Sequence, residues 1–168
     1  ITSIINITQP SVFFWNGVTA SNAACYNLPT AAINAPASGG TGTINYTLMP
    51  GSITNNTGAF PTIMSGAYTV TAVDANGCTL TTAFNLTQPA SYPAITTTNT
   101  IPTCVPGNDA TITVNTTGGT PNYLYSINSL PNQMSNVFTG IGISTYTVTV
   151  TDFNGCTVTS VIPVINNN

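Results

Sequence analysis

The sequence predicts an all-β protein, two antiparallel β-sandwiches in tandem with one extra strand in front. Three observations lead to this prediction. Apolar and Thr side chains alternate over many short stretches, the chain repeats itself after about 79 residues, and Asn-Gly pairs follow the strongest alternating stretches. Alternation with a period of two is typical of half-buried strands, and no stretch of the sequence has helical periodicity.

The clearest element occurs twice, at residues 66–79 and 144–157. In both copies every second residue of the first half is apolar, and threonine fills most positions between them. Each copy then reads Asp-x-Asn-Gly-Cys, in which Asn and Gly tolerate the positive φ of a tight turn. We therefore predict two hairpin turns, one formed by Asp74, Asn76 and Gly77 and the other by Asp152, Asn154 and Gly155.

The repeat divides the chain into three parts. Residues 1–10 and 80–89 share a pattern that ends in Thr-Gln-Pro, with an offset of 89 − 10 = 79. The cysteines keep nearly the same spacing, since Cys104 follows Cys25 by 104 − 25 = 79 and Cys156 follows Cys78 by 156 − 78 = 78. We predict an orphan strand at 1–10, a first repeat at 11–89 and a second at 90–168.

Each repeat should contain about six or seven short strands, as in a small sandwich. Besides the two strands that flank each Asn-Gly turn, the first repeat should have strands at 11–15, 31–35, 44–49 and near 60–64. Their clearest counterparts in the second repeat are 110–115, 123–127 and 138–141. Loops are expected at 25–29 and 52–61, and turns at the Gly-Gly pairs 39–40 and 118–119.

The orphan strand needs a partner. Its apolar residues Ile1, Ile5 and Ile7 occupy the positions of Leu80, Phe84 and Leu86 in the later copy, and an unpaired apolar strand would expose a reactive edge. We expect it to be the last strand of an upstream repeat in one long chain. The alternative is a donor strand that completes a neighbouring subunit. Both alternatives predict neighbouring copies or repeats as partners.

The composition excludes most chemistry. The chain has no Lys, Arg or His and only three acids, Asp74, Asp109 and Asp152. Without His or Lys there is little for general acid-base catalysis or for activating a nucleophile, and we predict no enzyme and no cofactor. The lack of cations argues against nucleic acid and anionic lipid as partners. No apolar run approaches the roughly 18 residues of a membrane span.

Four cysteines and a nearly uncharged, Thr- and Asn-rich surface are typical of an oxidising, extracellular compartment. The preferred pairing is Cys25 with Cys78 and Cys104 with Cys156, one bridge per repeat. If the strands follow immunoglobulin connectivity, however, the two cysteines of a repeat lie at opposite ends of the sandwich. A bridge needs α-carbons within about 7 Å, so the alternative joins neighbouring repeats, for example Cys25 with Cys156.

The second repeat resembles a known family along nearly its whole length. The matching residues are Cys104, Gly107-Asn108-Asp109, Ala110–Val114, Gly118-Gly119-Thr-Pro121, Tyr123–Ser126, Tyr146–Asp152 and Asn154–Thr157. They resemble the SprB-type repeat of giant surface adhesins in gliding Bacteroidetes. The first repeat departs from this pattern at residues 27–30 and at Gly42, where proline is usual. The resemblance implies tandem immunoglobulin-like modules in a cell-surface filament, exported by the type IX route.

Three further features have a functional and a structural interpretation. Asp74 and Asp152 are weak candidates for calcium ligands, although capping of a turn explains both, and we predict no metal site. Phe13, Phe14 and Trp15 form a candidate contact patch, for packing between repeats or subunits in preference to sugar stacking. Five sequons leave glycosylation open; they begin at Asn6, Asn45, Asn55, Asn85 and Asn115.

Together these features predict a non-enzymatic structural module of an extracellular bacterial adhesin or filament, built from disulfide-stapled tandem repeats. The alternative function is a module that binds a carbohydrate or another surface ligand. In either case surface glycans remain candidate partners.

Overall fold

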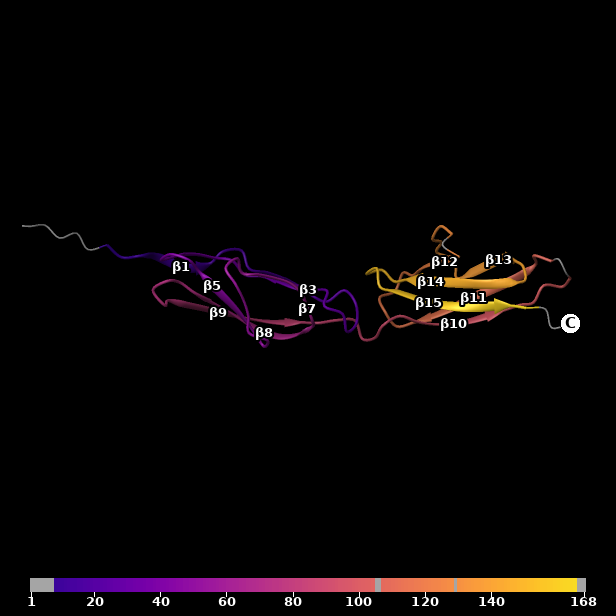
Figure 1. Ribbon diagram of the computed structural model, residues 1–168, viewed down its shortest axis with the longest axis horizontal. Helices are drawn as coiled ribbons and strands as arrows, with labels where there is room; N and C mark the ends of the chain where they lie inside the picture. Colours follow the sequence, from indigo (N-terminus) through magenta and orange to yellow (C-terminus); the bar gives the residue numbers. More distant parts are fainter. Residues whose placement is uncertain (1–7, 105–106, 129, 166–168) are drawn as a thin grey trace, which may run out of the picture. The chain divides into compact units, whose positions relative to one another are not determined.

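The computed structural model describes residues 8–104, 107–128 and 130–165. Every regular element in these ranges is a β-strand, and all strand pairs are antiparallel, which confirms the predicted fold class (Figure 1). No helix in the described ranges is long and apolar enough to span a membrane. Of the predicted orphan strand, Ile1, Ile5 and Ile7 lie outside the described residues. Its end, Thr8 to Pro10, forms no strand.

The chain forms two compact units. The first contains the residues up to Ala23 together with Leu28–Thr87, and the second contains Ala24–Asn27 together with the residues from Gln88 onward. The short segment Ala24–Asn27 therefore belongs to the second unit, although in sequence it is a loop of the first repeat. This assignment was not predicted, and the segment contains Cys25, whose bridge is described below.

The second unit is a sandwich of two three-stranded sheets. One sheet has the order β10 (Ala94–Asn99), β11 (Ala110–Thr117), β13 (Val137–Ile141). The other has the order β12 (Leu124–Ile127), β14 (Ser144–Thr151), β15 (Thr157–Val164). These are the A-B-E and C-F-G sheets of an immunoglobulin-like sandwich.

The core of the second unit follows from the alternation in its strands. Ile112 and Val114 on β11 and Val148 and Val150 on β14 are completely buried. The threonines between them are only partly buried. Because successive residues of a strand point to opposite faces, each strand contributes its apolar face to the core and its threonine face to the surface.

The first unit repeats this arrangement, with one of its two layers divided into short strands. Its four-stranded sheet has the order β6 (Ile53–Asn55), β5 (Asn45–Met49), β8 (Gly66–Val73), β9 (Thr79–Leu86). Facing it are a three-stranded sheet, β2 (Thr19–Ser21), β3 (Ala31–Asn34), β7 (Ala59–Ile63), and a separate pair, β1 (Ser11–Trp15) with β4 (Ala37–Gly40). Leu48 and Val70 lie in its core with no exposed surface.

Proline explains why the first unit has four short strands where the second has the long hairpin of β10 and β11. Pro36 lies between β3 and β4 and has no N–H to donate to a sheet. Its carbonyl still accepts a hydrogen bond from the N–H of Asn16, at 2.7 Å. Gly17 interrupts the partner strand at the same level, with a positive φ of 75°. The ladder therefore breaks here into two short pairs.

Candidate functional site: the two cysteine hairpins

In the first unit, the hairpin between β8 and β9 is organised by the buried carboxylate of Asp74. Its Oδ1 accepts hydrogen bonds from the N–H groups of Asn76 (3.0 Å) and Cys78 (2.8 Å), and its Oδ2 accepts one from Thr41 (2.9 Å). The side chain of Asn76 donates to the hydroxyl of Thr41 at 3.0 Å. The carboxylate thus joins the hairpin to Thr41, which follows the Gly-Gly pair at the end of β4. The prediction of a turn at this pair was wrong, because Gly39 and Gly40 continue β4, and Gly40 pairs with Ser11.

The hairpin between β14 and β15 in the second unit has the same structure. Asp152 accepts hydrogen bonds from the N–H groups of Asn154 (2.9 Å), Cys156 (2.9 Å) and Thr120 (2.9 Å). Asn154 donates to the Thr120 hydroxyl at 2.9 Å. The Asp-x-Asn-Gly-Cys motif and the distant Gly-Gly-Thr motif therefore form one structural unit, and each motif occurs in both repeats.

These contacts set the ionisation of Asp74. Desolvation by burial raises its pKa, but the N–H donors of Cys78, Thr41 and Asn76 together lower it below the ordinary value of 3.8. The pKa of Asp109 is also lowered, first by the hydroxyl of Thr103 and then by its N–H. Both carboxylates are thus acceptors held in the ionised form by hydrogen bonds of the fold.

The weak calcium candidates Asp74 and Asp152 do not converge with other ligands. Within the described ranges, no three His, Cys, Asp or Glu side chains lie close enough together to hold a metal ion. Each carboxylate directs both oxygens toward backbone N–H groups instead. The geometry agrees with the structural interpretation of these residues as turn caps.

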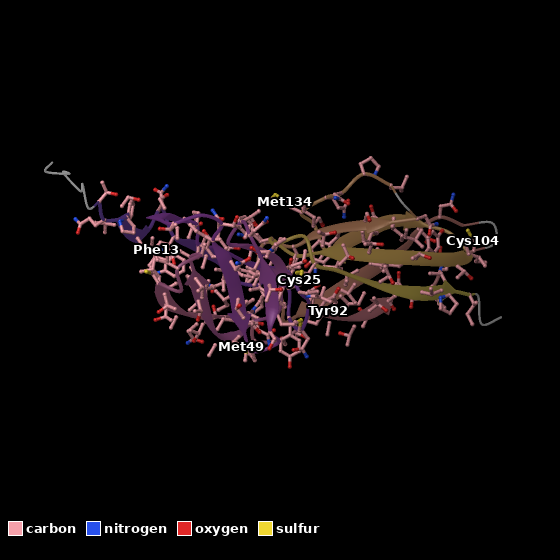
Figure 2. All side chains as sticks on the ribbon, turned by 60° about the vertical axis from the view of Figure 1, so that its left-hand side comes forward. Phe13, Cys25, Met49, Tyr92, Cys104 and Met134 are labelled. Carbon is pink, nitrogen blue, oxygen red and sulfur yellow. A yellow bond between two sulfur atoms is a disulfide. The ribbon has the colours of Figure 1, made fainter. Side chains whose placement is uncertain are left out.

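The disulfide of the second unit joins Cys25 to Cys156, with α-carbons 5.8 Å apart and a sequence separation of 131 (Figure 2). The segment Ala24–Asn27 is also held by hydrogen bonds. The amide of Asn154 donates to the carbonyl of Ala24 at 2.9 Å. The Gln88 side chain accepts from the N–H of Asn27 at 2.9 Å and donates to its side chain at 3.4 Å. Cys25 and Cys156 are both buried.

The preferred prediction of one bridge per repeat was therefore wrong, and the alternative pairing of Cys25 with Cys156 is the one observed. In the first repeat the reason lies in strand direction. The N–H of Ala23 bonds the carbonyl of Thr87, just after β9, whereas Cys78 lies just before β9. The length of this strand separates the two cysteines by roughly 30 Å at about 3.3 Å per residue, which is too far for a bridge.

The second repeat has the same geometry. Cys104 lies in the loop between β10 and β11, at the end of the sandwich where β15 finishes, and Cys156 lies where β15 begins. Figure 2 shows Cys25, the partner of Cys156, and Cys104 at opposite ends of this unit. Cys78 and Cys104 remain as exposed thiols.

The aromatic residues Phe13, Phe14 and Trp15 do not form one patch. Phe13 and Trp15 are partly buried and pack against the core of the first unit, and Phe14 is exposed. This is the expected alternation along β1.

A hollow of about 360 Å³ lies beside β12 and β13 in the second unit. Leu130, Val137 and Ile141 supply apolar walls, and Tyr146 and Gln133 supply polar groups. The hydroxyl of Tyr146 is hydrogen bonded to Gly142, at 3.2 Å. No sequence pattern predicts this hollow, since Leu130 and Gln133 lie in an irregular segment with no counterpart motif in the first repeat.

Comparison with known proteins supports the sequence resemblance in the second unit. Residues 94–132 match the family model of the SprB repeat. The match covers less than half of the chain; it includes β10, β11, β12 and Cys104 and ends before the hairpin of Asp152. No curated protein has a significantly similar sequence.

Among solved structures, the chain is similar to the C-terminal 282-residue fragment of intimin, in complex with the intimin-binding domain of the translocated intimin receptor. The TM-score is 0.50 and the identity 15%, over 91% of this chain and 64% of the fragment. At this identity the likeness shows the fold alone, an all-β, immunoglobulin-like fold. The chain spans less than two thirds of the intimin fragment.

The residues that hold Ala24–Asn27 in place were not predicted. Gln88 could have been found from its motif, since Thr-Gln-Pro occurs at both 8–10 and 87–89 without an obvious structural need for glutamine. Thr41 and Thr120 could have been found in the same way, because each follows a Gly-Gly pair. The repeats show which residues matter, but the partner of each residue becomes visible only in the folded chain.

Proposed function

We propose that the chain is a non-enzymatic structural module of an extracellular bacterial adhesin or filament. The observation that carries this proposal is the bridge between Cys25 and Cys156. It ties a loop of one repeat to the last hairpin of the next. A disulfide that links successive repeats makes the connection between them covalent. It also leaves neither cysteine as a free nucleophile.

The distribution of polar groups supports a passive role. The chain has no Lys, Arg or His, and its three carboxylates accept hydrogen bonds from neighbouring backbone N–H groups. General acid-base catalysis requires a positioned proton carrier with a tuned pKa, and nucleophilic catalysis requires an activating base. The SprB repeat is an adhesin-type module, which agrees with a passive role.

An extracellular location agrees with the family and with the chemistry. SprB repeats belong to cell-surface adhesins, and a disulfide persists in an oxidising compartment. Export by the type IX route and a part in gliding motility are finer proposals that rest on the family resemblance alone.

The partners we propose are neighbouring repeats or copies of the same chain. A surface with very little net charge favours association over mutual repulsion, which suits a protein assembled into a fibre. The intimin fragment was solved with a receptor domain, so a protein receptor at the free end of such a fibre is a further candidate partner.

Immunogold electron microscopy tests the proposed function. Antibodies raised against residues 90–168 are applied to intact, unpermeabilised cells that produce the protein, and then to permeabilised cells as the control. We expect gold along extended material at the cell surface. Labelling only after permeabilisation, or labelling of separate soluble particles, would contradict the proposal.

The hollow beside β12 and β13 favours ligand binding as a second candidate function. Its size of about 360 Å³ is in the range of small-ligand sites. A glycan array probed with the native chain and with Val137→Asp tests this candidate. Binding that the substitution removes supports a ligand site, whereas an array without signal, or one unchanged by the substitution, counts against it.

A further inference from the structure

The two exposed thiols occupy the same places in their repeats as the two bridged cysteines. Cys78 precedes β9 as Cys156 precedes β15, with the same carboxylate contact to its N–H group. Cys104 lies in the loop before β11, and Cys25 lies in the loop before β3. We call each cysteine position, together with the residues around it, a half-site. The hairpin half-site at Cys78 in the first unit and the loop half-site at Cys104 in the second unit each hold a free thiol.

The half-site around Cys78 already has the structure of the occupied one. The side-chain amide of Asn154 uses both of its N–H groups, one for the Thr120 hydroxyl and one for the carbonyl of Ala24. The equivalent Asn76 donates to Thr41. An amide NH₂ can donate twice, and the second N–H of Asn76 has no partner among the described residues. It is placed to hold the carbonyl that precedes an incoming cysteine.

The two hairpin cysteines differ in burial, because the segment Ala24–Asn27 covers only Cys156. Cys156 is 3% exposed under the segment Ala24–Asn27, whereas Cys78 is exposed. The glutamine that clamps this segment, Gln88, also has its counterpart in the first repeat. Gln9 occurs in the same Thr-Gln-Pro motif and is exposed.

The two open thiols do not complete one another within a single chain. In the observed bridge the loop cysteine comes from the earlier repeat and the hairpin cysteine from the later one. Cys104 is a loop cysteine of the later repeat and Cys78 is a hairpin cysteine of the earlier one, so their pairing would reverse this order. Each thiol must therefore find its partner in a further repeat.

We propose that Cys78 and Cys104 each form a disulfide of the Cys25–Cys156 type with an adjacent repeat of the same polypeptide. Cys78 would receive the cysteine loop of the repeat before it, and Cys104 would enter the hairpin of the repeat after it. This inference rests on the proposed function as a tandem module, and it names the partner of each repeat.

The chemistry requires a two-electron oxidant, for which a small-molecule disulfide serves. One protein thiolate attacks a sulfur of the small disulfide and releases one small thiolate, which leaves a mixed disulfide. The second protein thiolate then attacks the protein sulfur of that mixed disulfide and releases the other small thiolate. Two protein thiols are oxidised to one disulfide, and the small disulfide is reduced to two thiols.

Two single variants test the pairing with separate chains as stand-ins for adjacent repeats. Cys78→Ser keeps only the loop thiol and Cys104→Ser keeps only the hairpin thiol. The two are mixed in equal amounts in a buffer of oxidised and reduced glutathione. Random pairing gives as much heterodimer as the two homodimers together, and we expect a clear excess of heterodimer. A random distribution, or no dimer, would overturn the proposal.

Asn76→Ala in the Cys104→Ser background distinguishes disulfides that form after the cysteine loop binds at the Cys78 hairpin from disulfides that form by unspecific oxidation. We expect severalfold less heterodimer and unchanged homodimer, because only the heterodimer uses the Asn76 half-site. An unchanged heterodimer yield would contradict the proposed half-site. Chymotryptic peptides identify the linkage by mass spectrometry, since a chain without Lys or Arg gives trypsin no site.

A longer chain distinguishes a repeat of the same polypeptide from a second copy. The sequence is extended at its C-terminus by a second copy of residues 90–168. We expect Cys104 to pair with the appended counterpart of Cys156 in a monomer. Bridges formed only between separate chains would overturn the same-polypeptide assignment. Neither result depends on cell-surface labelling, so failure here is distinguishable from failure of the proposed function.

Discussion

At each cysteine hairpin one carboxylate accepts three backbone N–H groups, which would otherwise remain unpaired in a crowded turn. Asp152 is 3% exposed and Asp74 is 4% exposed, so water cannot readily replace these contacts. Hydrogen bonds to a charged acceptor are stronger than neutral ones. The carboxylate also fixes the Gly-Gly segment, because Oδ2 accepts from the threonine that follows the two glycines.

The second glycine of each pair is needed for this close approach. A Cβ at Gly119 would lie 2.8 Å from Oδ2 of Asp152, and the backbone there has φ of +64°. Gly155 has a similar φ of +84°, but a Cβ there meets nothing within 4 Å. A substitution at Gly155 therefore adds only backbone strain, whereas one at Gly119 adds backbone strain and a steric clash with Asp152.

We predict that Gly119→Ala destabilises the second unit by roughly 1–3 kcal/mol more than Gly155→Ala does. Both substitutions place Ala at a positive φ, and only the first also displaces the carboxylate that caps the hairpin. Urea unfolding followed by tyrosine fluorescence measures both variants. Equal losses of unfolding free energy would show that the carboxylate contact adds nothing.

The lowered pKa values of Asp74 and Asp109 predict how stability depends on pH. A carboxyl group with a lowered pKa in the folded state takes up its proton first in the unfolded state. Its stabilising effect is therefore complete above the unfolded pKa and is lost as the pH falls through the folded pKa. We expect a constant unfolding free energy from about pH 5 to 8 and a decrease below about pH 4.

Urea midpoints between pH 2 and pH 8 test this profile. The plateau follows because no His, Lys or Arg side chain is present to titrate. Asp74→Asn should reduce the acid-dependent decrease in the first unit, and a stability that rises on acidification would contradict the assignment of Asp74 as an ionised acceptor.

At the scale of elements, the strands that were predicted are those whose alternation is strong. The β8 and β14 strands have apolar residues at every second position, and their predicted extents agree with the structure. Strands β2, β4, β6 and β10 were missed. Thr19–Ser21 and Ile53–Asn55 contain too few apolar residues to show a period, the glycines of β4 were assigned to a turn, and Ile95 is the only large apolar residue of β10. Short segments such as β2 and β6 form strands because they pair with the backbone of β3 and β5. The sequence of a short segment does not show which strand will lie beside it.

The disulfide pairing could not be predicted from the sequence for a related reason. The similar spacing within the two repeats, 78 − 25 = 53 and 156 − 104 = 52 positions, suggests one bridge per repeat, but spacing carries no information on strand direction. The direction of β9 and β15 decides, since each carries the chain from one end of its sandwich to the other. The possibility of a bridge between repeats could be stated from connectivity, but only folded strand lengths exclude the pairing within a repeat.

Core strands should tolerate truncation poorly. Ile112 on β11 is completely buried, and Val161 on β15 is 63% exposed. We predict that Ile112→Ala lowers the unfolding free energy of the second unit by about 2–5 kcal/mol, because it leaves a cavity between the two sheets. Val161→Ala serves as the control and should change it by less than about 0.5 kcal/mol. Similar losses of unfolding free energy in the two variants would contradict the assignment of Ile112 to the core.

At the scale of the whole molecule, the bridge determines which residues can carry tension. A force applied to the two ends of the chain enters through the residues before Cys25, crosses the disulfide and leaves through the residues after Cys156. The 131-position loop between the two cysteines is shielded from extension. Outside this loop lie β1, β2 and β15 among the described strands, so only these can be peeled directly from their neighbours.

The same arrangement, repeated by Cys78 and Cys104 with further repeats, would give overlapping closed loops. A tandem chain of this kind resists extension through covalent bonds even when individual sandwiches open. Mechanical continuity of this sort is what a surface fibre requires, and it needs neither charge nor catalysis. The composition and the disulfide topology both agree with the proposed function.

Single-molecule force spectroscopy tests this account most directly. The chain is pulled from its two ends in oxidising buffer and again with a reductant, with Cys25→Ser as the variant that lacks the bridge. Release of the 131-position loop should add roughly 45 nm of contour length at about 3.3–3.6 Å per residue. We predict that this length is absent in the oxidised protein and present in the reduced protein and in Cys25→Ser. Equal contour lengths in oxidised and reduced protein would contradict the account.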